Sequence, residues 1–421
     1  MKYDLIVFGG GTSGVASAYI ASKYGLNVLL IEKSDVLGGS ITQGLVIPAM
    51  KLNSENINTE FYNDLLLNAS KFNAQATYGD MNDGWFNPEL LKIVLDDMLK
   101  SVNCTVLFST EPISCKFNNK KLFNVELNHK LLSLHIETDY IVDATSNGKI
   151  FKLLNYDFQE KNKKSQAASL RFILSGVDTK SFADFILNLD SDRNVTTAYK
   201  VDDKIMLSTA YTSDKSKNWA LAPIFKAAVQ NNDLEYEDTA YFQVFSVPAT
   251  ADSIAFNAPR IILNSDEDIL DPFTYSNALI QGRERIYRLY NFCKKYLKGF
   301  ENSYISHISD TLGVRESYRV KGKYTFTKND IINPKSFDNI AFSCDYPIDI
   351  HSNNNEDKLE FVKHNYLVPI ECLISKNNEK LYGVGRIISA DFEAQAALRT
   401  QMSCFSMGEA ASKDIFKKLK N

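Results

Sequence analysis

Residues 3–14 read Tyr-Asp-Leu-Ile-Val-Phe-Gly-Gly-Gly-Thr-Ser-Gly, and this stretch decides the fold. An apolar run typical of a strand meets a glycine cluster, and an alanine-rich helical segment follows from Val15 to Tyr24. Residues 28–32 form a second apolar run that ends on an acid, Glu32. The order strand, glycine turn, helix, strand and acid is the βαβ unit that binds dinucleotides.

The glycines of this turn have separate mechanical roles. Gly9 allows the tight turn out of the strand, Gly11 lets a pyrophosphate approach the backbone, and Gly14 lets the helix lie close to the sheet. The free N–H groups at the helix start then receive the phosphates. Glu32 follows Gly14 by 18 residues, where a carboxylate can accept the ribose hydroxyls. With all these parts in register, dinucleotide binding is favoured over a plain packing turn.

Composition narrows the class of protein. The chain has 421 residues, of which 44% are hydrophobic and 23% charged, which suits two globular domains or one with an insertion. A net charge of -4 without a basic block gives no reason to expect a nucleic-acid partner. The six cysteines and five histidines are scattered, so we expect no metal site. Without a signal-type or membrane-spanning segment, we expect a cytoplasmic protein with no membrane contact, and the oligomeric state stays open.

A second glycine pair, Gly38-Gly39, follows the acidic strand end within seven residues. The stretch resembles the FAD-dependent oxidoreductases of the glutathione-reductase-like fold, in which Glu-x-x-x-x-x-Gly-Gly brings the backbone against the cofactor. The alternative for this piece alone is a flexible loop. The resemblance implies that FAD is the cofactor, and that Pro112 and Asp143 meet the nucleotide at the ends of the next two parallel strands.

The rest of the chain predicts a Rossmann-type domain with an insertion. Residues 88–99 have helical periodicity, residues 104–108 and 140–145 read as buried strands, and residues 113–142 as a small antiparallel meander. The fold class is therefore α/β, with a parallel sheet, the meander and an inserted α+β substrate domain. We predict a discontinuous FAD domain of residues 1–150 and 360–421, and an inserted substrate or cap domain of residues 151–359.

The segment Gly313-Val-Arg-Glu-Ser-Tyr-Arg-Val-Lys-Gly322 is the sharpest motif outside the N-terminus. It is similar to the Gly-x-Arg-Glu-Ser-x-Arg-x-x-Gly segment of one FAD-dependent oxidoreductase family. Arg315 and Arg319 bracket Glu316 and can hold a substrate carboxylate through bidentate bonds. A structural Arg–Glu network between two domains is the equally weighted alternative.

The C-terminal segment completes the resemblance. Leu381 to Arg386 reads as a strand that ends on Gly-Arg, and a helix rich in small residues follows. In the resembling family this helix starts beneath the flavin, where its positive end stabilises the reduced ring. The expected cofactor contacts are Gly9, Gly11, Thr12, Ser13, Gly14, Glu32, Lys33, Gly38, Gly39, Ser40, Pro112, Asp143, Gly385, Arg386, Arg399, Thr400 and Met402.

These patterns lead to one main functional hypothesis. We expect an enzyme that transfers a hydride between FAD and a small, polar or anionic organic substrate. Arg315 and Arg386 are the expected substrate-orienting residues, and His364 is the expected proton-transfer residue, although a structural role for His364 is also open. The alternatives are an NAD(P)-dependent dehydrogenase, which the glycine pair disfavours, and a flavin-binding electron-transfer or RNA-modification partner without turnover of its own.

Overall fold

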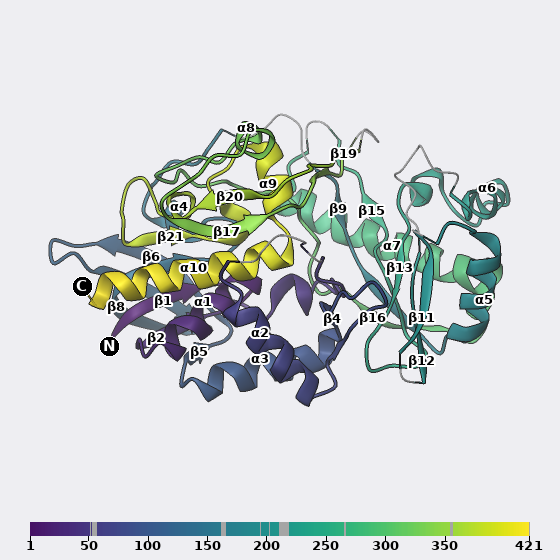
Figure 1. Cartoon of the computed structure of the whole chain (residues 1–421), viewed down its shortest axis with the longest axis horizontal. Helices are drawn as coiled ribbons and strands as arrows, with labels where there is room; N and C mark the ends of the chain where they lie inside the picture. The colour runs from purple at the N-terminus through teal and green to yellow at the C-terminus, as the bar shows by residue number, and fades with distance from the viewer. Residues whose placement is uncertain are drawn as a thin grey trace.

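The computed structural model of the chain describes residues 1–50, 52, 57–160, 166–193, 195–201, 203–209, 219–264, 267–353 and 357–420. Two β-sheets, each covered by helices, lie at opposite ends of an elongated molecule (Figure 1). The N- and C-termini lie close together at the end that holds the first sheet (Figure 1). The two sheets and the segments between them determine where a ligand can bind.

The first sheet is the predicted dinucleotide-binding sheet. Its strand order is β5 (Thr105–Leu107), β2 (Val28–Ile31), β1 (Lys2–Phe8), β8 (Leu132–Asp143), β7 (Phe123–His129) and β6 (Thr110–Phe117), with β21 (Leu381–Gly383) also paired with β8. Strands β5, β2, β1, β8 and β21 pair in parallel, whereas β6, β7 and the first half of β8 form an antiparallel meander. The predicted α/β fold class is confirmed.

Both faces of this sheet are covered, which explains its uninterrupted apolar strands. In β1, Leu5 and Val7 contribute to the core under the helices, whereas Ile6 and Phe8 contribute to the core under the meander. All four side chains are fully buried. Strands of a parallel sheet that is covered on both sides need no polar face, so apolar residues occupy consecutive positions.

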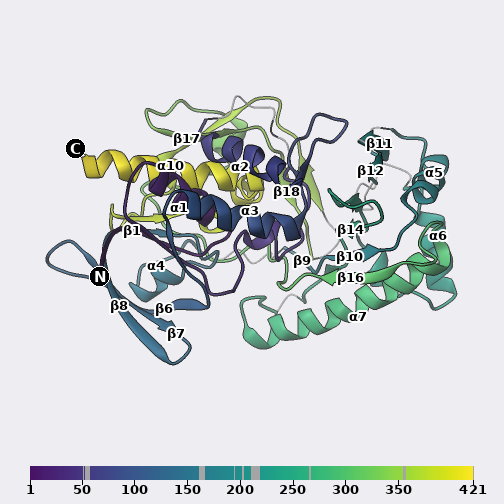
Figure 2. The same ribbon diagram turned by 90° about the horizontal axis from the view of Figure 1, so that it is seen from below.

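Four helices cover one face of the first sheet. They are α1 (Thr12–Lys23), α2 (Glu60–Lys71), α3 (Pro88–Ser101) and α10 (Gln401–Lys420). Helices α1 and α10 lie side by side, although their sequences are almost 400 residues apart (Figures 1 and 2). Ser17 and Ser412 join the two helices through hydroxyl groups 2.7 Å apart. The C-terminal helix thus supports the helix that follows the glycine turn.

The second sheet is antiparallel and belongs to the predicted insertion. Its order is β11 (Thr197–Val201), β12 (Lys204–Ser208), β13 (Val244–Ser246), β14 (Ile254–Phe256), β10 (Phe172–Ser175) and β16 (Tyr304–Ile308). Its helices are α5 (Thr179–Leu189), α6 (Ala222–Gln230) and α7 (Pro272–Tyr296). Helices α5 and α6 lie at the far end of the molecule, and α7 runs from its middle toward that end (Figure 2). One face of the sheet shares an apolar core with these helices.

The remaining elements are short. They are α4 (Lys149–Leu153), α8 (Lys328–Ile332), α9 (Phe392–Leu398), β3 (Gln75–Ala76), β4 (Trp85–Phe86), β9 (Ala168–Ser169), β15 (Arg260–Ile261), β17 (Ile340–Cys344), β18 (Ile348–Ile350), β19 (Lys358–Glu360) and β20 (Tyr366–Pro369). Buried side chains between Phe326 and Tyr366 pack in the core of the first sheet. The chain therefore returns to the core of the first sheet before residue 360. The domain boundaries stay a prediction.

Within the ranges given above, the helices are either too short or too polar to cross a bilayer. The same residues bring no three His, Cys, Asp or Glu side chains together as a set of metal ligands.

Candidate functional site

A cavity of about 2050 Å³ lies between the two sheets. Its volume exceeds the roughly 300–1,000 Å³ of an ordinary small-molecule pocket, so it can hold a dinucleotide together with a second ligand. The wall contains these predicted site residues: Gly9, Gly11, Thr12, Ser13, Glu32, Lys33, Gly39, Ser40, Pro112, Arg315, Gly385, Arg386, Arg399 and Thr400. Segments far apart in the sequence therefore meet where the sequence predicted a single site.

The glycine turn presents an uncapped helix end to this cavity. Helix α1 has Gly11 at its N-cap, without a side-chain cap and without an acidic residue in its first turn. A Cβ atom built on Gly11 would meet nothing within 4 Å. The first N–H groups of a helix lack intrahelical partners and attract anions, so this open space suits a phosphate.

The second glycine pair packs directly against the first turn. Gly38 and Gly39 adopt φ angles of 94° and 54°, which favour glycine. The Gly38 N–H donates to the Gly10 carbonyl at 2.8 Å. A Cβ atom on Gly39 would lie 3.0 Å from the Gly11 Cα. The two turns thus form one backbone surface with almost no side chains, and a ligand can approach it closely.

Glu32 stands at the end of β2 with its carboxylate held in place. One oxygen accepts the Gly10 N–H at 2.6 Å, and the other accepts the Ser34 N–H at 2.8 Å and the Ser34 hydroxyl at 2.7 Å. A carboxylate has about four lone-pair positions, so Glu32 retains capacity for the hydroxyl groups of a ligand. These bonds fix its orientation toward the cavity, whose wall it joins.

Gln401 ties three segments together at the other side of the glycine turns. The Thr12 hydroxyl donates to the Gln401 side-chain oxygen at 2.6 Å, and the Gln401 amide donates to the Ser40 hydroxyl at 2.9 Å. Helix α10 begins at Gln401, so its N-terminus lies at the cavity wall beside Thr400. Gln401 itself was missed, because nothing in the sequence links it to residues 12 and 40.

Several predicted site residues lie outside the cavity wall and have structural contacts instead. A Cβ on Gly14 would lie 1.7 Å from the Gly9 carbonyl oxygen, so Gly14 allows helix-to-turn contact. The fully buried Asp143 carboxylate accepts backbone N–H groups of Thr145 and Ile150, which shapes the loop after β8. Gly38 contacts the first turn as described, and Met402 packs in the core of the first sheet. These four support the wall from behind.

The prediction for His364 does not match its position. The ring is exposed, and its Nε2 atom lies 2.7 Å from the Ile331 carbonyl oxygen. It is absent from the cavity wall. His364 lies in the surface loop just before β20. Its closeness in sequence to an apolar strand does not indicate which way the ring points. We assign it no chemical role.

The Gly313–Gly322 motif divides between the two roles proposed for it. Arg319 is buried and donates to Glu316 at 2.8 Å and to the Glu160 carbonyl at 2.8 Å, which is a structural network. Arg315 faces the cavity and donates to the Ala167 carbonyl at 2.5 Å. The two arginines therefore point to different surroundings and do not bracket one ligand.

Three arginines of the cavity wall lack an acidic partner. Among the side chains that the structure describes, no carboxylate lies within ion-pair distance of Arg171, Arg315 or Arg386. Burial lowers the pKa of Arg171 and Arg386 to about 10. Burial and the charges of Arg399, Arg171 and Arg260 lower the pKa of Arg315 to about 9. All three remain charged at neutral pH, and a bound anion would relieve their mutual repulsion.

A buried network around His351 borders the same arginines. The Arg260 guanidinium donates to the His351 Nδ1 at 2.9 Å and binds Asp357 at 2.7 Å and 2.9 Å. The His351 Nε2 lies 3.2 Å from Asp349, which also accepts from Arg399. Because Nδ1 accepts a hydrogen bond, His351 is neutral with its proton on Nε2. Burial, followed by the charge of Arg315, lowers its pKa to about 4.

Four cavity or network residues were not predicted from the sequence, and only one of them has a local sequence signal. Arg171 precedes strand β10, and strand alternation places it on the same face as Ile173, so it was within reach of a pattern argument. His351, Asp349 and Arg260 meet through tertiary contacts between β15, β18 and the loop before β19. No local pattern links them.

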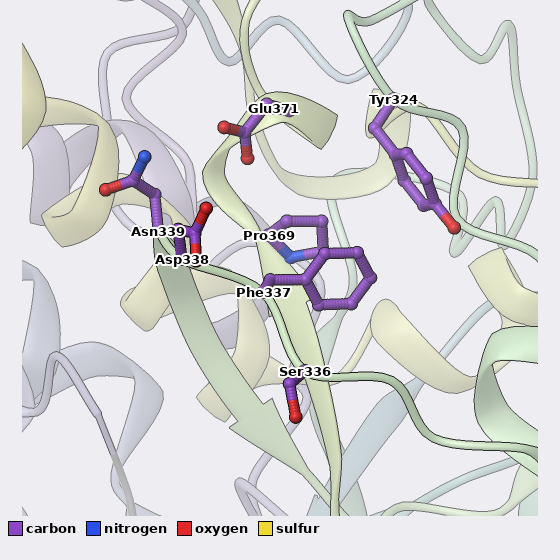
Figure 3. A pocket seen from close by; sticks show the side chains of 7 residues that line it. All are labelled: Tyr324, Ser336, Phe337, Asp338, Asn339, Pro369 and Glu371. Atoms are coloured by element: carbon purple, nitrogen blue, oxygen red, sulfur yellow. The ribbon is translucent and has the colours of Figure 1, made fainter.

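A smaller pocket of about 260 Å³ lies elsewhere, near β17 and β20. Figure 3 shows the side chains that line it: Tyr324, Ser336, Phe337, Asp338, Asn339, Pro369 and Glu371. It contains two acidic side chains and no arginine, so it is unsuited to a phosphate or a carboxylate. None of the predicted site residues lines it.

Comparison with known proteins identifies the family. Residues 4–413 match the family described as FAD dependent oxidoreductase. The chain belongs to this family. Its cofactor is therefore FAD, and the protein is an FAD-dependent oxidoreductase. The uncapped start of α1, the open space at Gly11 and the oriented Glu32 carboxylate fit the pyrophosphate and ribose of FAD.

One curated relative and two solved structures illustrate the similarity. A glutathione reductase of Debaryomyces hansenii is 50% identical over 48 residues, which are 11% of this chain and 10% of that protein. A geranylgeranyl bacteriochlorophyll reductase-like protein of Thermoplasma acidophilum is 13% identical over 100% of this chain and 79% of its own, with a TM-score of 0.45. A flavin-dependent brominase is 11% identical over 100% and 80%, with a TM-score of 0.46. The matched stretch thus spans about a tenth of the curated relative.

Proposed function

We propose that this FAD-dependent oxidoreductase transfers a hydride between FAD and a small, polar or anionic organic substrate. The observation that carries the proposal is the set of three cavity arginines, Arg171, Arg315 and Arg386, without carboxylate partners in the described structure. Keeping several like charges together in a partly buried site is unfavourable unless an anion offsets them. A substrate with an acidic group supplies that charge.

The bound flavin supplies two-electron chemistry, and the protein supplies orientation. Arg315 is anchored by the Ala167 carbonyl, so its guanidinium retains donors for a ligand in a fixed direction. Arg386 donates hydrogen bonds to the carbonyls of Ser146 and Val314. Fewer of its donors are then available for a ligand, so it contributes to substrate binding mainly through its charge. Arg315 therefore contacts substrate in this proposal, and Arg386 holds the wall together while adding positive charge.

The proposal is tested by reducing the bound flavin without oxygen. The purified holoprotein is mixed anaerobically with small carboxylates that carry an oxidisable C–H bond, and with their amides. We expect the flavin absorbance to bleach with one class of carboxylate and much more slowly with its amide. Arg315→Met should lower the rate of bleaching about 100-fold while FAD stays bound, since a hydrogen bond to a charged group contributes about 1.5–3 kcal/mol.

Arg283→Met is the matched control, because Arg283 is exposed on α7 and away from the cavity wall. Its bleaching rate should equal that of the natural protein. Loss of FAD together with unfolding in Arg315→Met would favour a structural role for this residue. A flavin that no organic compound reduces would contradict the proposal and favour a flavin-binding partner protein without turnover.

A further inference from the structure

The floor of the cavity on the second-sheet side is divided into an apolar and a polar row. Ile173 pairs with Ala255, and Ala255 pairs with Phe245, so these three side chains form a row across β10, β14 and β13. Ala255 and Phe245 line the cavity, whereas Ile173 is buried and lies outside its wall. Arg171 lies two residues before Ile173, on the same face and about 6.6 Å further along the strand. Asn257 continues this second row, two residues beyond Ala255. The apolar row and the charged row are thus close enough for one small molecule to contact both.

Aromatic side chains from neighbouring segments pack beside the apolar row. We call Tyr78, Trp85, Tyr199 and Phe245 the aromatic wall, and all four line the cavity. The rings of Tyr78 and Trp85 stack with centroids 4.4 Å apart, and Phe245 meets Trp85 edge-on at 5.6 Å. The Tyr78 hydroxyl lies 2.7 Å from the Thr197 hydroxyl. Tyr78 and Trp85 are almost fully buried in this stack, whereas Tyr199 and Phe245 are partly exposed, so the rings of Tyr199 and Phe245 are the surface that the wall presents to the cavity.

The polar side is positive and retains hydrogen-bond donors. Arg399, Arg171 and Arg260 act on Arg315 with like charge, and Asp349 is the carboxylate that acts on it most strongly. Asp349 already accepts from Arg399 and contacts His351. The Nε atom of Arg399 is buried without a hydrogen-bond partner in the described part of the chain. The nearby carboxylates therefore do not balance the positive charge of the cavity arginines.

We infer that the substrate is an amphipathic organic anion, with its acidic group at Arg171 and Arg315 and a ring-sized apolar body against the aromatic wall. This inference rests on the proposed function and narrows its substrate class. Burial of a ring against the wall supplies affinity, since apolar contact contributes in proportion to the area removed from water. The arginines orient the bound molecule, since a carboxylate matches the planar guanidinium.

Binding to the FAD-loaded full chain tests the inference without requiring turnover. Isothermal titration uses three matched probes, which are 3-phenylpropionate, propionate and 3-phenylpropanamide. The first has both the charge and the ring, and each of the others lacks one. We expect 3-phenylpropionate to bind at least tenfold more tightly than either of the other two.

Two cavity variants assign the two parts of the site. Arg171→Met should weaken 3-phenylpropionate at least tenfold and leave the amide unchanged. Phe245→Ala should weaken both phenyl probes several-fold and leave propionate unchanged. Arg283→Met and Phe273→Ala replace exposed residues of α7 and should change none of the three affinities. A retained flavin spectrum shows that each variant has folded.

The outcomes separate this inference from the proposed function. Equal binding of all three probes, or a selective loss that also appears in the α7 controls, would overturn the amphipathic-anion assignment. If small aliphatic carboxylates bleach the flavin while phenyl compounds neither bind nor react, the proposed function stands and this inference is wrong. If 3-phenylpropionate binds as expected but no anion reduces the flavin, the proposed hydride transfer is wrong and the binding site stands.

Discussion

Gly11 and Gly14 are three residues apart, yet an added methyl group would meet different surroundings at each. At Gly11 it would enter open space, and at Gly14 it would lie 1.7 Å from the Gly9 carbonyl oxygen. Gly11→Ala should therefore fold with a stability within about 1 kcal/mol of the natural protein. Its FAD affinity should fall about 10- to 100-fold, because the methyl group separates the backbone donors from a phosphate.

Gly14→Ala is the matched comparison, and it should lower the free energy of unfolding by about 3 kcal/mol through overpacking. Chemical denaturation of both proteins without flavin, followed by FAD titration, checks the pair. Tight FAD binding by Gly11→Ala would show that the pyrophosphate lies elsewhere.

His351 makes a separate prediction about acid stability. Its pKa is lowered in the folded protein from 6.5 to about 4, chiefly by burial. As pH falls below 6.5 the unfolded chain binds the proton first, so stability present above 6.5 is progressively lost down to about pH 4. The slope is at most about 1.4 kcal/mol per pH unit.

His351→Gln keeps an acceptor for Arg260 and removes this titration, so its unfolding free energy should vary less between pH 6.5 and 4. His135→Gln, at an exposed histidine of the meander, serves as the control and should retain the natural slope. Denaturant melts at several pH values measure both. An unchanged slope in His351→Gln would assign the acid sensitivity to other groups.

Single residues also show what the sequence could and could not predict of the site. The glycines, Glu32 and the start of α10 follow from local patterns, because each role depends on a backbone conformation within a few residues. The separation of Arg315 from Arg319 does not, because both occur in one motif and only tertiary contacts send one to the cavity and the other to Glu316. The position of His364 outside the cavity wall likewise depends on tertiary contacts that the local sequence does not report.

Among the elements, the contact between α1 and α10 carries the next prediction. A Cβ on Gly408 would lie 2.1 Å from the Ser13 carbonyl oxygen and 2.9 Å from the Ser17 nitrogen. Gly408→Ala should push α10 away from α1 and lower the unfolding free energy by about 1–3 kcal/mol. FAD should also bind more weakly, because the starts of both helices lie at the cavity wall.

Ser412→Ala gives the control for this interface. It removes hydrogen bonds between α10 and Ser17 without adding bulk, so it should cost about 1 kcal/mol and leave FAD affinity unchanged. Denaturation and flavin titration are compared for the two variants. Equal FAD affinity in Gly408→Ala and the natural protein would mean that α10 is not coupled to the cofactor site.

Strand β8 shows where prediction of elements reached its limit. The sequence predicted a meander strand and a separate buried strand, and the structure has one strand, Leu132–Asp143, which performs both functions. Its first half pairs with β7, and its last residues pair with β1 and β21. The alternation of apolar and polar residues indicates which side chains are buried. It does not indicate whether two neighbouring apolar runs form one continuous strand, because that depends on pairing partners that are distant in sequence.

At the scale of the whole molecule, the cavity depends on two sheets with separate cores. FAD binds the folded chain, so it should stabilise by mass action, by about 2.7 kcal/mol at a concentration 100 times its Kd. For a chain of this length that corresponds to a rise in Tm of about 3 °C. Thermal melts of the flavin-depleted protein with FAD or NAD check this. A shift with NAD alone would contradict the assignment of FAD.

The most direct test of the account is the electron density in the cavity between Gly39, Arg315 and Thr400, in crystals of the FAD-loaded protein soaked with 3-phenylpropionate. We predict FAD with its pyrophosphate against Gly11 and its ribose at Glu32, and a carboxylate beside Arg171 and Arg315 with the phenyl ring toward Phe245. Density for FAD in which the pyrophosphate lies against the arginines, or a phenyl ring outside the cavity, would contradict it.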